Sequence, residues 1–381
     1  MTPLPRAAFD MAPALVYLNH AAAGILPRPT RDAVTAFIDA HASRGVLGTR
    51  PFQDAIGAHR AAVGALIGAS GEEIALLRHT GEGATALAQG IDWRAGDEIV
   101  LSDNEFGSNA YPWLALREKG VVIRFVPTAR ERLTPDVLRR MLTARTRLVA
   151  VSWVSFTDGF RHDLAALGEV ARAHGAYFMI DVMQGLGAFP LDVRSFPCDA
   201  VYAGGGKWLL ALQGIAFLYL RSDLLDSIKL RLPSWRSVAD MWNFLDYEQP
   251  PVADVSRFEG GTPNYLGALS LATSIEFLRA HDVSAIADHV LSLTDRLVEG
   301  LERAGARVSS IRDGARRSGI VTFNLEGHDP SALGRRLGEN GFCVTYYPFG
   351  IRVSPHGYNT PAEIDAFVET VSDVSALARR R

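Results

Sequence analysis

The segment "VYAGGGKWLL", residues 201–210, places one lysine, Lys207, after three glycines and among apolar residues. An ammonium group is costly to bury unless it is paired or used in chemistry. Three interpretations are open at this point: a loop that cradles phosphate, a turn that faces solvent, and a lysine that forms a Schiff base with a carbonyl compound. The segments around Lys207 decide among them, and they also decide the fold.

The phosphate-loop interpretation fails on spacing. A Walker-type loop has a Gly, four residues, Gly-Lys and then Ser or Thr. Counted from Lys207, the first of these positions is Val201 and the last is Trp208. Both ends of the motif are therefore missing, and a nucleotide-binding loop is disfavoured.

Short apolar runs alternate with helical patterns between about residues 70 and 220. The runs lack polar alternation, which is typical of strands covered on both faces of a sheet. Strands that alternate with helices predict an α/β fold of three layers with a doubly wound, mostly parallel sheet. The expected strands are 97–102, 121–127, 147–152, 177–181, 199–203 and 215–220, and the expected helices are 110–119, 134–144 and 162–174.

The pattern changes after about Gly260. Two long helices, 266–281 and 284–304, are followed by expected strands at 320–325, 342–347 and 351–354, a helix at about 330–340 and a closing helix from about Pro361. We therefore expect a large cofactor-binding domain at 21–258 and a smaller α+β domain at 259–381, with the N-terminal segment 1–20 packed on the small domain. Residues 222–258 are expected to connect the two or to cover the active site.

Composition excludes several classes of protein. Of 381 residues, 48% are hydrophobic and 21% charged, as in soluble globular proteins with a large core. A formal net charge of -3 gives no reason to expect a nucleic-acid partner. Two cysteines do not make a disulfide framework, so we expect a reduced, cytoplasmic setting. We expect no membrane span, no secretory signal and no metal, because no long apolar run and no zinc-type spacing is present.

A carboxylate is expected near the lysine. The run "YFMIDVMQGLG" ends a predicted strand with Asp181, and Gln184 follows three residues later. Open α/β sheets place their ligands at the carboxyl ends of the strands. An acid there is either a helix N-cap or a ligand group. Because the next strand leads directly into the glycines, we expect Asp181 and Lys207 at the same edge of the sheet.

A third segment suggests a phosphate site. "LRHTGEGATALAQGI", residues 77–91, predicts a turn that opens a helix, with Thr80 as its cap. Free N–H groups at a helix start bind phosphate, although an ordinary capped helix explains the same pattern. A lysine, an acid and such a helix start are the parts that pyridoxal 5'-phosphate (PLP) chemistry requires: an amine for the aldehyde, a carboxylate for the pyridine nitrogen and donors for the phosphate.

The chain resembles fold-type I PLP enzymes of the class V aminotransferase superfamily, which includes cysteine desulfurases, kynureninase-like and isopenicillin N epimerase-like enzymes and certain C–S lyases. Seven segments carry the resemblance in the family's order: "YLNHAAAGILP", "RHTGEG", "NEFGSNAYPW", "IDVMQ", "GGGKWL", "RFEGGTPN" and "IRVSPHGYNT". The resemblance implies a PLP enzyme that acts at the α-carbon of a small amino acid through a Lys207 aldimine. It is expected to be an aminotransferase or a C–S β-elimination lyase; the alternatives are an epimerase and a non-catalytic binding protein that keeps the fold.

The resemblance also implies roles for individual residues. Lys207 would be the Schiff-base lysine and the acid/base group, and Asp181 would hold the pyridine nitrogen. His20 and His356 would either touch the substrate or serve as structural hydrogen-bonding groups. The other implied contacts are Thr80 and Gly81 at the phosphate, Phe106 on the ring face, Gln184 near the 3-hydroxyl, Arg352 on the substrate carboxylate, and Thr262 reaching the phosphate of the neighbouring subunit in a homodimer with shared active sites.

Departures from the family bear on the reaction. Cysteine desulfurases carry a Cys on a mobile loop before the arginine strand, but "FCVTYYPFGIR", residues 342–352, leaves no room for it, and Cys343 is expected in the core. Phe106 replaces a stacking histidine, and Gly204 and Gly206 stand where many relatives have Ser and His. The missing cysteine loop disfavours persulfide-forming desulfuration. We place β-elimination slightly ahead of epimerisation, although the residues do not separate the two.

Overall fold

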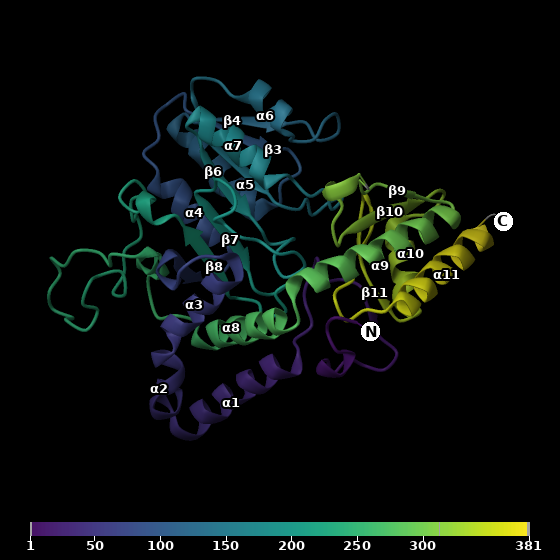
Figure 1. Ribbon diagram of the computed structural model, residues 1–381, viewed down its shortest axis with the longest axis horizontal. Helices are drawn as coiled ribbons and strands as arrows, with labels where there is room; N and C mark the ends of the chain where they lie inside the picture. The colour runs from purple at the N-terminus through teal and green to yellow at the C-terminus, as the bar shows by residue number, and fades with distance from the viewer. Residues whose placement is uncertain (1, 312, 379–381) are drawn as a thin grey trace.

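The computed structural model describes residues 2–311 and 313–378 (Figure 1). Its larger part is a seven-stranded sheet in the order β2-β8-β7-β6-β5-β3-β4. Only β8 runs antiparallel to its two neighbours, and the other pairs are parallel. The strands are β2 (Ile74–Leu77), β3 (Glu98–Ser102), β4 (Val122–Val126), β5 (Thr146–Ser152), β6 (Tyr177–Asp181), β7 (Ala200–Gly204) and β8 (Ala216–Leu220). The predicted doubly wound, mostly parallel α/β fold is confirmed.

Helices cover both faces of this sheet because alternate residues of its strands are apolar on both sides. In β7, Val201 and Ala203 belong to one buried cluster, whereas Ala200 and Tyr202 belong to another. The helices of the first face include α3 (Ile56–Ile67), α6 (Pro135–Met141), α7 (Leu164–His174) and α8 (Tyr265–Ala280), and those of the second include α4 (Thr80–Gly90) and α5 (Gly107–Leu114). Two apolar cores thus sandwich the sheet.

The smaller part has an antiparallel sheet in the order β12-β13-β10-β9. Its elements are β9 (Ala306–Val308), β10 (Val321–Leu325), β12 (Thr345–Tyr347), β13 (Gly350–Val353), α9 (Val283–Arg303), α10 (Pro330–Glu339) and α11 (Pro361–Ala378). The prediction of one strand at 342–347 is wrong. The segment is divided at Val344 into β11 (Phe342–Cys343) and β12, because β11 pairs instead with β1 (Val16–Tyr17) near the N-terminus.

The core packing bears on the domain boundary. Helix α8 packs against α1 (Arg28–Arg44) and α3, and its Leu271 and Ile275 lie in a core of the large sheet. Helix α9 spans both parts, with Ile286 in that core and Leu297 in the core of the small sheet. The division into 21–258 and 259–381 stays a prediction, and the packing of α8 favours a later boundary.

Residues 222–258 have little regular structure, and Figure 1 shows this segment as a long loop that projects from the large sheet. It exposes several large apolar side chains, among them Trp242 and Tyr247. Within the described residues, no helix is both long and apolar enough to span a bilayer. The same residues hold no group of three or more His, Cys, Asp or Glu side chains placed to bind a metal ion.

Candidate active site

A cavity of about 660 Å³ opens at the carboxyl ends of β5 and β6. It brings together six residues that the sequence singled out for the cofactor: Thr80, Gly81, Phe106, Asp181, Gln184 and Lys207. They come from the start of α4, the residue before α5, the end of β6 and the connection after β7. The sheet edge therefore gathers groups from four separate segments, as parallel strands with a common direction do.

Lys207 lies in the connection between β7 and β8, and its amine faces this cavity rather than open solvent. Burial lowers the pKa of Lys207 to about 8; the Asp181 charge opposes this shift, and the Arg352 charge adds to it. The Nζ atom is 5.3 Å from the centroid of the Phe106 ring. A solvent-facing turn is therefore disfavoured, and a lysine that becomes neutral near physiological pH suits a nucleophile or a base.

Asp181 is the last residue of β6, and its Oδ1 accepts a hydrogen bond from the backbone N–H of Met183 at 2.8 Å. This bond closes a turn and does not cap a helix, because no helix begins there. Burial raises the pKa of Asp181 to about 6, against the Met183 hydrogen bond and the Lys207 charge. A buried carboxylate of this kind is stabilised by a cationic N–H partner, which a protonated pyridine provides.

The start of α4 fits a phosphate. The sequence predicted Thr80 as the N-cap, but the N-cap is His79, whose Nδ1 accepts a hydrogen bond from the backbone N–H of Glu82 at 3.1 Å. Thr80 is then the first residue of the helix, and its hydroxyl is buried without a hydrogen-bond partner. An unpaired buried hydroxyl is unfavourable. A phosphate oxygen at this helix start would satisfy it.

The glycines beside Lys207 keep space open next to Thr80. A second cavity of about 180 Å³ is lined by Gly204 and Gly206 and also by Thr80 and Lys207. A Cβ atom at Gly204 would lie 2.7 Å from the terminal methyl of Met183 and 3.4 Å from the Thr80 hydroxyl. Any side chain at Gly204 would therefore compete with Met183 for this space. The residues present fit PLP, with a phosphate held mainly by α4.

Phe106 and Gln184 occupy the cavity differently. The Phe106 ring is 47% exposed and meets Phe156 edge-on at 5.3 Å between centroids, which leaves a ring face free for stacking. The Gln184 amide is held at both ends: it donates to the Ala21 carbonyl at 3.0 Å and accepts from the Trp208 indole at 2.9 Å. Gln184 therefore has a fixed orientation at the cavity wall.

Arg352 lies on β13 and is 2% exposed. Its Nη1 donates to the Phe156 carbonyl at 2.9 Å, whereas its buried Nε has no partner. Among the ion pairs of residues 2–311 and 313–378, none includes Arg352. Burial lowers the pKa of this guanidinium, so a carboxylate ligand would relieve a costly buried charge.

His20 and His356 are fully buried, and their rings lie 4.9 Å apart. His20 donates from Nδ1 to the Ser354 carbonyl at 3.0 Å and accepts from the Tyr358 hydroxyl at 2.8 Å. His356 donates from Nε2 to the Trp208 carbonyl at 3.0 Å and accepts the next backbone N–H at 2.7 Å. Burial lowers the pKa of both histidines, that of His356 to about 4. Neither residue is brought to the cavity wall, and the structural alternative is favoured for both.

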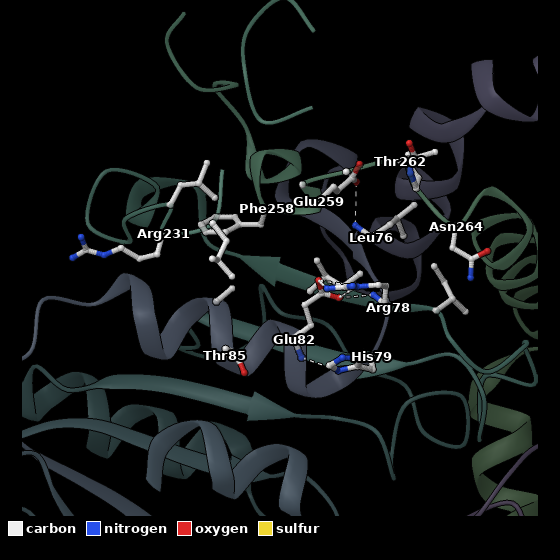
Figure 2. A pocket seen from close by; sticks show the side chains of 18 of the residues that line it. Leu76, Arg78, His79, Glu82, Thr85, Arg231, Phe258, Glu259, Thr262 and Asn264 are labelled. Atoms are coloured by element: carbon white, nitrogen blue, oxygen red, sulfur yellow. Dashed lines mark hydrogen bonds and ion pairs between the residues drawn. The ribbon is translucent and has the colours of Figure 1, made fainter. Parts of the chain in front are cut away.

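Thr262 is exposed and lies in a different cavity of about 400 Å³ (Figure 2). There it shares the wall with Asn264, Glu259 and the ion pair of Arg78 with Glu82. The structure does not bring Thr262 to the Lys207 cavity of its own chain. Its role toward a neighbouring subunit stays a prediction.

One acidic residue beside the site was not singled out by the sequence. Glu105 receives hydrogen bonds from Ser152, which lines the Lys207 cavity, and burial raises the pKa of Glu105 to about 7. Its only sequence signal was its place in the segment "NEFGSNAYPW".

The sequence model of the family described as aminotransferase class-V matches residues 16–367. A probable cysteine desulfurase from Methanothermobacter thermautotrophicus is 28% identical, with 95% of each chain covered. A cysteine desulfurase from Salmonella agona is 29% identical over 95% of this chain and 94% of that protein. The apo structure of a cysteine desulfurase from Thermococcus onnurineus has a TM-score of 0.89 at 25% identity, with 97% of each chain covered. The chain therefore belongs to the aminotransferase class-V family, as its motifs predicted, and is a PLP-dependent enzyme.

Proposed function

We propose that this enzyme is a lyase that eliminates a sulfur substituent from the β-carbon of a small amino acid, without forming a persulfide on a protein cysteine. The relatives named above are cysteine desulfurases, which supports carbon–sulfur cleavage. The single observation that carries the second half of the proposal is the position of this chain's two cysteines.

Neither Cys198 nor Cys343 lines the Lys207 cavity. Cys198 is buried, and burial raises its pKa to about 12. Cys343 lies on β11, where burial also raises its pKa, and its sulfur accepts from the Asn19 amide at 3.8 Å. The thiolate is the nucleophilic form of cysteine, and both environments oppose it. The sequence contains no third cysteine to take this role.

Bound PLP supplies an electron sink for negative charge at the substrate α-carbon. Asp181 would hold the proton of the pyridine nitrogen, which keeps this sink electron-poor. Lys207, with its lowered pKa, removes the proton from the α-carbon and can return a proton to the leaving sulfur. The net reaction converts the substrate and one water into a thiol, pyruvate and ammonia, and it needs no oxidant or reductant.

Arg352 binds the substrate carboxylate in this mechanism. Because Nη1 is occupied by the Phe156 carbonyl, the free edge of the guanidinium consists of Nε and Nη2. These two N–H groups form a fork that matches the two oxygens of a carboxylate. The contact with Phe156 holds the opposite edge, so that the fork is oriented before the substrate arrives.

We also propose a homodimer in which Thr262 reaches the phosphate bound in the neighbouring subunit. The exposure of Thr262, and its position in a cavity other than the Lys207 cavity of its own chain, support this arrangement.

The test is a product assay on a panel of amino acids, with purified enzyme that shows an absorbance band of bound PLP. We expect pyruvate, ammonia and a thiol or sulfide in equal amounts from a β-sulfur substrate. The double variant Cys198→Ala, Cys343→Ala should keep turnover within about threefold of the unmodified enzyme, because neither thiol reacts. Loss of turnover in the folded double variant would contradict the proposal, as would a change of substrate chirality without release of pyruvate, which indicates an epimerase.

A further inference from the structure

The side chains on either side of Asp181 belong to one hydrogen-bonded cluster. In the sheet register, Ser152 of β5 and Tyr202 of β7 are the direct neighbours of Asp181. Residues aligned in this way on parallel strands project from the same face of a sheet. Asp181 is therefore flanked by two hydroxyl groups on the face that carries α4 and α5.

Both hydroxyls lead to Glu105, the residue two positions before α5. Glu105 accepts the backbone N–H of Ser152 at 2.9 Å, the Ser152 hydroxyl, and the Asn109 amide at 2.9 Å. Tyr202 reaches the cluster by donating to the Asn109 Oδ1 at 2.6 Å. The Trp113 indole, which can only donate, lies 3.4 Å from the same oxygen and so fixes the orientation of the Asn109 amide.

We propose that Glu105 is a positioning residue that sets the hydrogen-bonding polarity of the Ser152 hydroxyl beside Asp181. When Glu105 is ionised, the Ser152 proton is committed to it, and only oxygen lone pairs of Ser152 face the cavity. When Glu105 is protonated, it can donate to Ser152, whose own proton is then free to point into the cavity. One proton on Glu105 thus converts Ser152 from an acceptor into a donor next to the cofactor.

The surroundings of Glu105 bring the loss of its proton close to neutral pH. Burial and the negative charge of Asp181 on β6 raise the pKa of Glu105 to about 7, against three hydrogen bonds from Ser152 and Asn109. Tyr202 on β7 stays neutral because burial and both carboxylates raise its pKa well above its usual value. The groups that α5 and β5 contribute, Asn109 and Ser152, are uncharged.

The inference rests on the proposed PLP chemistry, and two variants test it. In Glu105→Gln, the side chain no longer titrates, so the Ser152 hydroxyl keeps one orientation at every pH. We expect the ionisation of about pH 7 to disappear from the pH profile of kcat/KM and from the pH titration of the cofactor absorbance band. In Ser152→Ala, this ionisation should also disappear or weaken at least about threefold in amplitude, and adding Glu105→Gln to it should change nothing further.

The matched control is Ser108→Ala, which removes a hydroxyl from the same cavity that has no bond to Glu105 and should keep the ionisation. The proposal is overturned if Glu105→Gln keeps the ionisation, or if the effects of Glu105→Gln and Ser152→Ala add. A readout on the apoprotein separates this result from a failure of the proposed function. Folded Glu105 holds its proton to a higher pH than the unfolded residue, so it contributes stability that is lost as the pH rises from about 4.5 to 7. In urea unfolding, the stability of the Glu105→Gln apoprotein relative to the unmodified apoprotein should therefore rise over this pH range. Equal slopes in the two apoproteins would also overturn the inference.

Discussion

Two buried polar clusters lie close together in this protein and differ in one respect. In the cluster of His20, His356 and Tyr358, the ring nitrogens and the hydroxyl all have hydrogen-bond partners. At the Lys207 cavity, the hydroxyl of the wall residue Thr80 and the Nε of Arg352, which is bonded to the wall residue Phe156, are buried without any. Because native proteins pair nearly all buried polar groups, the first cluster is complete as it stands, whereas the second leaves atoms that a ligand would satisfy. Between these two clusters, the difference lies in the unsatisfied atoms and not in the types of residue.

The largest effect is expected for Lys207→Ala. It removes the amine that we propose for both the cofactor linkage and proton transfer, so turnover should fall at least about a thousandfold. The fold should persist, because the truncation also removes a buried charge. Turnover assays together with circular dichroism and thermal unfolding check this. Substantial turnover in the folded variant would show that the Lys207 cavity is not the active site.

Asp181→Asn should lower kcat by about a hundredfold, since a neutral amide holds the pyridine proton poorly. The same substitution should stabilise the apoprotein. Burial raises the pKa of Asp181 from 3.8 to about 6, so the folded state binds more protons than the unfolded state in this window, and stability is lost as the pH rises through it. Asn lacks this loss, and the variant should gain about 1–3 kcal/mol at pH values above about 6 and nothing below about 4. Urea unfolding at both limits measures the difference, and equal stabilities at high pH would contradict it.

Arg352→Lys keeps the positive charge but replaces the fork by a single ammonium group. KM should rise about 10- to 100-fold with a much smaller change in kcat, because the contact is made to the substrate carboxylate before and during the reaction. Steady-state kinetics with a substrate of the panel, and with the matching amine that lacks the carboxylate, provide the measurement. If KM for the amino acid is unchanged, Arg352 is not the carboxylate clamp.

Tyr358→Phe should have the smallest effect, because it removes one oxygen from the cluster that is already complete. The His20 Nε2 loses its donor, which should cost about 1–2 kcal/mol of unfolding free energy. Turnover per folded molecule should stay within about twofold of the unmodified value. A larger loss of turnover per folded molecule would indicate that the histidine cluster takes part in the reaction, and the two clusters would then not differ in function.

The sequence was sufficient to predict most of the large sheet and the edge of that sheet at which the candidate active site lies. Unalternated apolar runs predicted six of the seven large-sheet strands, and the shared direction of parallel strands brought Asp181 and Lys207 together. Helix α1 was not predicted, because it buries only Thr30 and therefore lacks the apolar face by which a helix is recognised in a sequence. The break at Val344 follows from pairing with β1, more than three hundred residues away, which no local pattern contains.

The completeness of a polar group could not be predicted either. His20 and His356 carried the same sequence signal as a substrate ligand, and their partners Ser354, Tyr358 and Trp208 lie far away in the chain. Likewise, Glu105 depends on Ser152, a residue 47 positions later. Such partnerships are tertiary, so residue types alone indicated chemistry but did not distinguish satisfied groups from unsatisfied ones.

The bond from Arg352 to the Phe156 carbonyl joins the small sheet to the loop that follows β5 of the large sheet, and a neighbouring bond runs from the Thr322 hydroxyl to the Thr157 carbonyl at 2.7 Å. Arg352, the side chain that would bind the substrate carboxylate, therefore also connects the two parts of the protein. By thermodynamic linkage, a substrate that binds better when this hydrogen bond is formed also stabilises the contact between the two parts of the protein. A change that weakens the contact would weaken substrate binding by the same free energy. If Arg352 binds the substrate carboxylate, Thr322 would therefore influence substrate affinity through this junction.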